Sequence, residues 1–261
     1  MKPYLKILLL AISQHFFMHA FSQVVQKKVE HVTHTWVSIN SNIFLDKNWF
    51  IMADAHLREN GFYKSNSFYF GRIGLGYQYD KSLSVAAGYG NLLSSPTTPG
   101  FTTKSDENRI YQQVVYNSSY KNKVNVLQRL RNEQRWQDII VNDKKTGEKK
   151  FTNRVRYLLS TSLQVFKNPN LPQLVVADEL LVQFGSAIVF NTFDQNRIFI
   201  GIKQKITNSL SFDAGYMQVF QQKSSGINYT QSNTARLFFY YTFKNKHADK
   251  NLHHKVLDGQ E

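Results

Sequence analysis

Apolar and polar residues alternate with a period of two along most of the chain from residue 31 onward. In 48–58 every odd position is apolar, whereas the even positions include Asp54, His56 and Arg58. A period of two places successive side chains on opposite faces of a β-strand. The pattern predicts about eleven strands of roughly 8 to 17 residues. They are 31–41, 48–58, 68–79, 83–90, 109–120, 124–136, 152–165, 174–190, 196–206, 210–220 and 234–243.

The connections between these segments alternate in length, which is typical of an up-and-down barrel with one turn side and one loop side. Short turns are expected at 45–48, 79–82, 120–123, 167–172 and 207–209, and longer links at 58–66, 92–108, 137–150 and 222–233. The link at 190–195 is short for its class. Eleven strands would leave the first and last parallel, and bacterial barrels have even strand numbers. We therefore expect an all-β, antiparallel up-and-down transmembrane β-barrel of about 12 strands, with 10 as the alternative.

The polar faces of several strands carry charge. Arg129, Arg131, Glu133 and Arg135 stand two apart and share one face. Burying such a row unpaired in the core of a soluble sandwich would be too costly, whereas a wet barrel lumen could hold it. Further charges fall on the inward faces of other strands. The predicted lumen network comprises Arg109, Arg129, Arg131, Glu133, Arg135, Arg154, Arg156, Glu179 and Arg197.

Two interpretations of this network stay open. Ion pairs commonly pack small lumens, so the first is a structural network that fills the barrel, and it is the favoured one. The second is a narrow pore that prefers anions, because arginines outnumber acids among these residues. Small anionic solutes are the candidate cargo of such a pore.

The apolar faces would contact either lipid or a soluble core. Aromatic residues recur near the strand ends and suit the interfacial girdles of a membrane barrel. They are Trp36, Trp49, Tyr77, Tyr79, Tyr89, Tyr116, Tyr120, Trp136 and Tyr157. A soluble periplasmic binding barrel is the alternative, but its inside would be apolar and every arginine face would have to turn outward. The membrane barrel, in contact with outer-membrane lipids, is the favoured interpretation.

The two ends of the chain indicate export. Residues 1–22 have the charged start, the short apolar run and the small-residue cleavage site of a signal peptide. We therefore expect a cleaved signal at 1–22, a barrel over 23–243 and a charged tail over 244–261. The segment 234–243 ends on Phe243 and resembles the signal that the outer-membrane assembly machinery recognises. The predicted location is the outer membrane.

Composition excludes several classes of protein. The chain has 261 residues, 42% of them hydrophobic, with a mean hydropathy of −0.40, so it is not a helical membrane protein. It contains no cysteine, which excludes disulfides, thiolate metal sites and cysteine nucleophiles. The formal net charge of +14 suggests anionic partners. Nucleic acid is not expected among them, because an exported chain rarely meets it. No cofactor or metal is predicted.

One pair of residues suggests a catalytic alternative. Asp54 and His56 share a face, and His34 lies on the neighbouring predicted strand. A base oriented by a carboxylate would have this arrangement, as in a lipid-modifying barrel enzyme. No GxSxG motif supplies a serine, and the glycines of 74–77 and 88–90 lie in strands with no helix after them. The chain is therefore not expected to be an enzyme.

Four short runs, in order, carry a family resemblance. They are RLRNEQRW (129–136), NRVRY (153–157), ADEL (177–180) and FDQNR (193–197), the last followed by Gly201. Together they resemble the domain of unknown function 2490 family of outer-membrane β-barrels, found in Bacteroidetes and other Gram-negative bacteria. The His-Arg that commonly opens the arginine-rich strand is Gln128-Arg129 here. The resemblance covers most of 31–243 and implies an outer-membrane barrel with no assigned activity.

Overall fold

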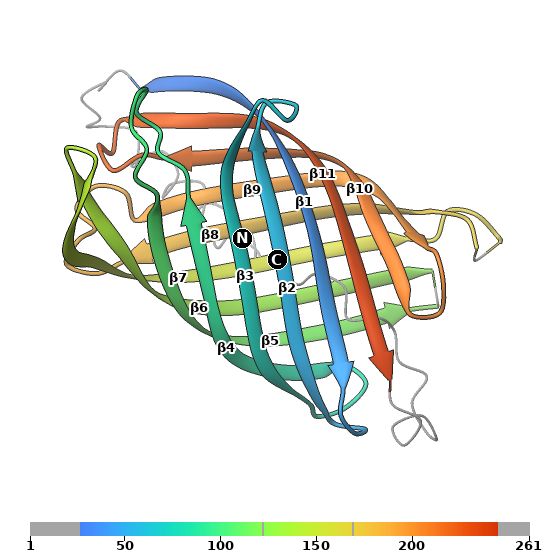
Figure 1. Ribbon diagram of the computed structural model, residues 1–261. Coiled ribbons are helices and arrows are strands. Elements are labelled where there is room, and N and C mark those ends of the chain that lie inside the picture. Colours follow the sequence, from blue (N-terminus) through green and yellow to red (C-terminus); the bar gives the residue numbers. More distant parts are fainter. Residues whose placement is uncertain (1–26, 122, 169, 245–261) are drawn as a thin grey trace, which may run out of the picture.

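The computed structural model describes residues 27–121, 123–168 and 170–244, and the described chain is all β. Eleven strands lie side by side around a closed barrel (Figure 1). The strands are β1 (Lys28–Phe44), β2 (Trp49–Asn60), β3 (Ser65–Gln78), β4 (Leu83–Ser94), β5 (Ser105–Tyr120), β6 (Val124–Val141), β7 (Lys144–Leu163), β8 (Gln173–Phe184), β9 (Phe193–Lys205), β10 (Leu210–Gln222) and β11 (Asn228–Lys244).

Each strand pairs antiparallel with the next, so the predicted up-and-down barrel is confirmed. The way in which the barrel closes corrects the prediction. β1 and β11 pair in parallel, from Lys28 opposite Asn228 to Phe44 opposite Lys244. Eleven strands can therefore close without a twelfth, because a parallel ladder also pairs the backbone N–H and C=O groups of both strands. The described barrel consists of the eleven strands that alternation predicts.

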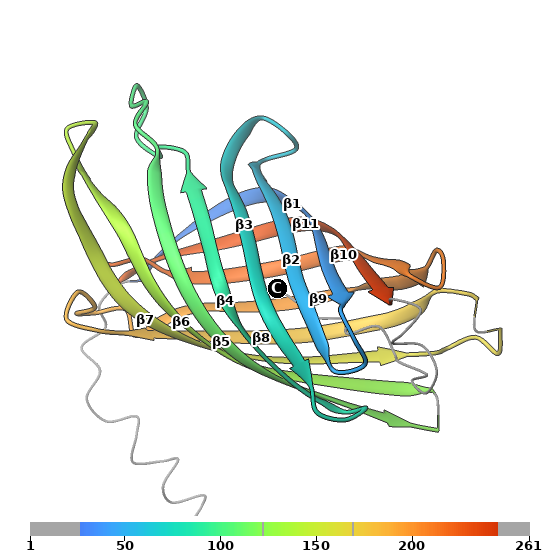
Figure 2. The same cartoon turned by 60° about the horizontal axis from the view of Figure 1, so that its bottom comes forward.

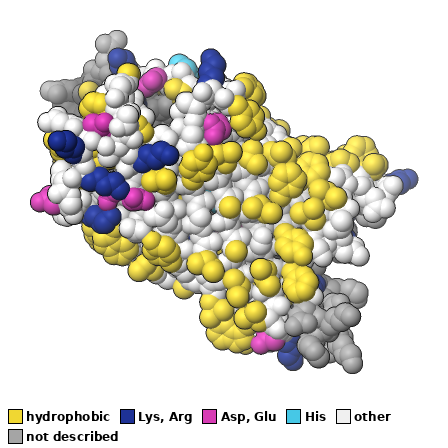
Figure 3. All heavy atoms as spheres, viewed as in Figure 1, with side chains coloured by type: hydrophobic (Ala, Val, Ile, Leu, Met, Phe, Trp, Pro, Cys, Tyr) yellow, Lys and Arg dark blue, Asp and Glu magenta, His cyan; other side chains and the backbone are white. Residues whose placement is uncertain are grey.

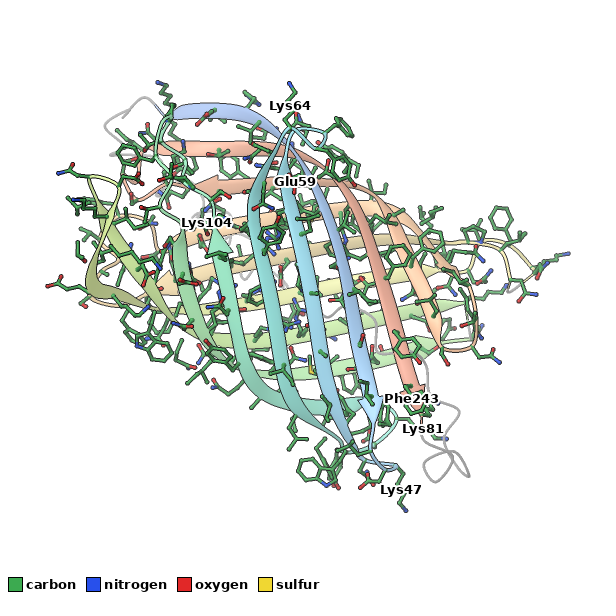
Figure 4. The ribbon with its side chains drawn as sticks, viewed as in Figure 1. Lys47, Glu59, Lys64, Lys81, Lys104 and Phe243 are labelled. Carbon is green, nitrogen blue, oxygen red and sulfur yellow. The ribbon has the colours of Figure 1, made fainter. Side chains whose placement is uncertain are left out.

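The connections lie at two opposite ends of the barrel. We call the end with the connections after β1, β3, β5, β7 and β9 the turn end, and the other the loop end. Figure 4 shows Lys47, Lys81 and Phe243 at the turn end, and Lys64 and Lys104 at the loop end.

The predicted long link at 137–150 is mostly strand. β6 continues to Val141 and β7 begins at Lys144, so the two strands form a long hairpin that rises at the loop end (Figures 1 and 2). Asn142 and Asp143 form its tip with φ angles of 50° and 59°. Asn and Asp tolerate this left-handed region better than other non-glycine residues, which permits a two-residue turn. The missing glycine explains why the sequence did not predict the turn.

Asp143 fastens the hairpin tip to the connection between β4 and β5. The backbone N–H of Thr103 donates to Asp143 Oδ1 at 2.7 Å, and that of Thr102 donates at 3.0 Å. These two donors stabilise the ionised carboxylate, so they lower the pKa of Asp143 below its ordinary value. The contact therefore depends on the charge of Asp143.

This contact is expected to be sensitive to acid. A depressed pKa in the folded state means that the contribution is present above the ordinary Asp pKa and is lost as pH falls through the lower, folded value. Asp143→Asn should remove it at neutral pH. We expect faster hydrogen exchange at the amides of Thr102 and Thr103 in this variant. Glu148→Gln, in the same hairpin, is the matched control and should leave both amides protected.

The outward faces of the strands form an apolar surface around the barrel. Figure 3 shows hydrophobic side chains covering the viewed face, with charged residues gathered toward its ends. Ile73 is 58% exposed, Ile200 52% and Leu130 52%, on three different strands. Further large apolar residues that point outward are Ile39, Leu75, Val85, Ile110, Val114, Leu159, Val176, Leu180, Ile198 and Ile202. This surface is the predicted apolar face of each strand.

Large side chains fill the interior. Phe50 and Tyr111 are each 1% exposed. The Phe50 ring lies against Gly76, and the Tyr111 ring lies against Gly74. A Cβ at Gly74 would collide with the Tyr111 hydroxyl, and one at Gly76 with the Phe50 ring. The glycines that alternate along β3 therefore make room for aromatic rings from β2 and β5.

Trp36 corrects one detail of the predicted aromatic girdle. It is only 5% exposed and points into the barrel, where its ring lies 3.3 Å from the Arg58 guanidinium carbon. The Arg197 guanidinium lies 5.2 Å from the same ring. Cation–π contacts of this kind stabilise buried arginines.

Two of the predicted domains lie outside the described residues. The signal peptide at 1–22 does so entirely, and the tail at 244–261 does so apart from Lys244, which is the last residue of β11. Both stay predictions. In the described part of the chain, no helix is long and apolar enough to cross a membrane, a finding that does not concern strands.

Candidate functional site

Glu133 on β6 is one centre of the buried charge network. Its carboxylate accepts from Arg154 at 2.5 Å and from Arg156 at 3.0 Å, both on the adjacent strand β7. Arg131 lies two residues away on the same face, at 3.9 Å. The antiparallel register sets these contacts, because Glu133 is directly opposite Arg154, and Arg131 opposite Arg156.

Glu179 on β8 is the second centre and accepts from three arginines. Arg129 donates at 2.5 Å, Arg156 at 2.8 Å and Arg197 at 3.1 Å. Arg129 is on β6, so its contact spans the barrel interior past β7. Arg156 also binds Glu133, and it therefore joins the two centres into one network.

The third centre is Glu107 on β5, which was predicted to lie in a loop. It accepts from Arg109 at 2.5 Å and from Arg135 at 2.7 and 2.9 Å. Asp194 on β9, also missed, accepts from Arg154 at 3.2 Å. Arg154 therefore pairs with carboxylates on both sides of β7.

The structure thus brings all nine predicted network residues into ion pairs inside the barrel. Sequence signals for the two missed acids were present. Glu107 is two residues before Arg109, hence on the same face, and only the misplaced end of the strand hid it. Asp194 lies in the FDQNR run, at a strand start that alternation could not locate.

Asp54 has a different partner from the one considered in the catalytic hypothesis. It forms a close ion pair with Arg72, which lies directly opposite on β3. His56 is 6% exposed, and neither ring nitrogen has a hydrogen-bond partner. Its ring instead packs between those of Phe70 and Phe238, at 5.4 and 6.2 Å. An oriented acid–base pair is therefore absent at these two residues.

The network is buried and carries an excess of positive charge. Arg129 and Arg131 are 0% exposed and Glu133 is 1% exposed. Gln113 accepts two hydrogen bonds from Arg131, at 2.9 and 2.6 Å. Nine interior arginines of the described chain form ion pairs with six acids, an excess of three positive charges. The arginines are the seven predicted ones with Arg72 and Arg236, and the acids are Asp54, Glu107, Glu133, Glu179, Asp194 and Asp213.

Comparison with known protein families shows to which family the chain belongs. A family model described as a protein of unknown function, DUF2490, matches residues 33–231. The chain belongs to this family. The match runs from β1 into β11 of this DUF2490 protein and includes all nine residues of the predicted network. A search of curated proteins finds no match.

The described part of the DUF2490 barrel contains no cluster of side chains suited to a metal ion. Across the described residues, no three His, Asp or Glu side chains gather in a way that could hold a metal ion. The acids inside the barrel are instead committed to arginines.

Proposed function

We propose that this DUF2490 protein is an outer-membrane β-barrel whose interior is closed by its arginine–carboxylate network. The observation that carries the proposal is the inverted arrangement of the barrel. Charged side chains are buried inside, while isoleucine, leucine and valine are roughly half exposed outside. In water such an extended apolar surface would drive association, whereas lipid chains would solvate it.

The turn end has the composition of a membrane boundary. Tyr79 is 71% exposed and Tyr120 65% exposed, as suits rings at the level of lipid headgroups. A lysine lies at each of the five connections of this end. These lysines are Lys47, Lys81, Lys121, Lys167 and Lys205. Lysine ammonium groups there would meet the phosphates of outer-membrane lipids.

Export and assembly complete the proposal. The predicted signal peptide would deliver the chain across the inner membrane. β11 ends with the outward-facing Phe243, which is 46% exposed and is followed only by Lys244 within the strand. This strand would be the one that the barrel assembly machinery recognises.

A closed interior best fits the burial of the network. A channel wide enough for water would leave exposed area on the side chains that line it. Arg129 and Arg131 have none. The favoured role of the network is therefore structural: it fills the barrel and fixes its strands in register.

The pure protein is expected to give no stable conductance steps in planar lipid bilayers. Its interior side chains would block ions, because Arg156 bridges Glu133 and Glu179 and all three side chains are buried. A general porin in the same bilayers provides the positive control. Steady unitary currents from this protein would contradict the closed barrel.

An anion-preferring pore is the second candidate function. The excess of three buried positive charges favours it, since it would attract small anions to any path that opens. A reversal potential shifted toward that of chloride in a KCl gradient would identify this function in the same experiment.

Two further alternatives have less support. A lipid-modifying enzyme would use His56 and Asp54, but His56 packs against two phenylalanines and Asp54 binds Arg72. Membrane lipid profiles should therefore be the same with His56→Ala as with the wild type.

A soluble periplasmic barrel would be released by a carbonate wash, whereas we expect this protein to stay in the membrane fraction.

A further inference from the structure

We propose that the outer surface of β5 and β6 binds a second copy of this chain within the membrane. The inference rests on the proposed membrane location. Three polar side chains interrupt the outward apolar surface near the middle of these strands: Gln112 on β5, with Asn132 and Gln134 on β6. We call these three residues the carboxamide patch.

The patch is joined by hydrogen bonds but is not saturated by them. Gln112 donates to Gln134 Oε1 at 3.1 Å and accepts from Asn132 and Gln134, each at 3.3 Å. A primary amide carries two N–H donors, so about half of the donors of the patch find no acceptor within it. Acyl chains offer no hydrogen-bond partner, and leaving polar groups unmet in hydrocarbon is costly. The polar surface of another protein could supply acceptors for these N–H donors.

Outward polar side chains elsewhere on the described barrel differ from the patch. Asp178 on β8 points outward and accepts from Asn196 on β9 at 2.5 Å. Asn233 on β11 accepts from the Tyr216 hydroxyl at 2.6 Å and lies opposite Gln218 on β10. Along β2 the outward positions from Ile51 to Leu57 are apolar, and Figure 3 shows apolar side chains over the viewed face. The patch is distinct from both polar groups because its three members are carboxamides bonded to one another.

A groove lies beside the carboxamide patch, so this part of the outer surface is hollowed. It has a volume of about 580 Å³, with Trp49, Leu75 and Leu130 among its walls and the small Ala87 in its lining. Gln112 and Asn132 also line it. The surface therefore combines an apolar hollow with a hydrogen-bonding edge, as the centre of a protein interface does.

A second copy of the chain is the occupant that this chemistry favours. Every carboxamide is both a donor and an acceptor, so the patch is complementary to itself. Two copies related by a twofold axis near Gln112 would bring the two patches together, each amide facing an amide of the partner. Such an isologous contact closes on itself and gives a dimer.

Cysteine cross-linking in native membranes tests the proposal, because the chain has no cysteine of its own. Gln112→Cys, Asn132→Cys and Gln134→Cys are introduced singly and oxidised. A disulfide forms only where two Cα atoms come within about 7 Å. We expect at least one of the three to give a band at twice the mass of the monomer on the same gel. Ile39→Cys and Ala55→Cys, outward on β1 and β2, are matched controls and should stay monomeric.

A second measurement tests the same interface without introducing cysteines. The triple variant Gln112→Leu, Asn132→Leu, Gln134→Leu should remain carbonate-resistant in the membrane but elute as a monomer in mild detergent, where the wild type elutes as a dimer. A wild type that is monomeric, equal cross-linking at the control positions, or a cross-linked band of another mass would overturn the proposal. Loss of carbonate resistance in the wild type would instead overturn the proposed membrane location.

Discussion

Glu179→Gln is expected to destabilise the barrel by about 3–5 kcal/mol, the range for breaking a buried ion pair by removing one partner. The variant keeps the shape of the side chain and removes only its charge. Glu179 accepts from Arg129, Arg156 and Arg197, all inside the barrel. The interior already holds more arginines than acids, so the loss of this carboxylate leaves three guanidinium groups with one fewer counter-charge where water cannot solvate them.

Urea unfolding of the protein in lipid vesicles, followed by tryptophan fluorescence, measures this loss. Glu148→Gln is the control, since Glu148 is exposed on the β7 side of the hairpin, and it should change stability by less than about 0.5 kcal/mol. The double variant Glu179→Gln, Arg156→Gln should regain part of the stability, because the two residues form one ion pair. A cost below about 1 kcal/mol for Glu179→Gln would show that the network does not hold the barrel together.

Ile200→Arg is the second large effect that we expect, with a cost of about 2–4 kcal/mol, as for arginine at the middle of a lipid-facing strand. Ile200 is 52% exposed and lies centrally on β9. The substitution separates the membrane barrel from a soluble one. In water, arginine at such an exposed position would change stability by only about 0.5 kcal/mol.

The control for this variant is Val189→Arg. Val189 is 71% exposed and lies at the loop end, in the connection between β8 and β9. It should tolerate arginine, because the charge would remain in water. Equal stability of both variants in vesicles would argue against lipid around β9, and therefore against the outer-membrane proposal.

The ion pairs show how far prediction from sequence reached. Alternation placed Arg129, Arg131, Glu133 and Arg135 on one face, and the structure brings that face inside the barrel. It could not pair Arg129 with Glu179, because the contact passes over a whole strand and depends on the curvature of the barrel. The acid that balances Arg135 was also missed, since Glu107 lies where a loop was expected.

The partner of Asp54 was missed for a related reason. Asp54 and His56 do share a face, as their spacing requires. Whether they interact depends on what the neighbouring strand places opposite them. β3 places Arg72 directly opposite Asp54, and a charged partner competes better for a carboxylate than a neutral imidazole does.

The sequence by itself determined the strands, their two faces and the barrel class. These follow from the period of two, which is a local property of an extended backbone. Only the tertiary structure decided how the barrel closes and which charges meet. The parallel seam between β1 and β11 joins the two ends of the sheet, and the Arg129–Glu179 pair joins strands that are not neighbours. Both depend on register and curvature accumulated over the whole sheet, and no local pattern of residues encodes that sum.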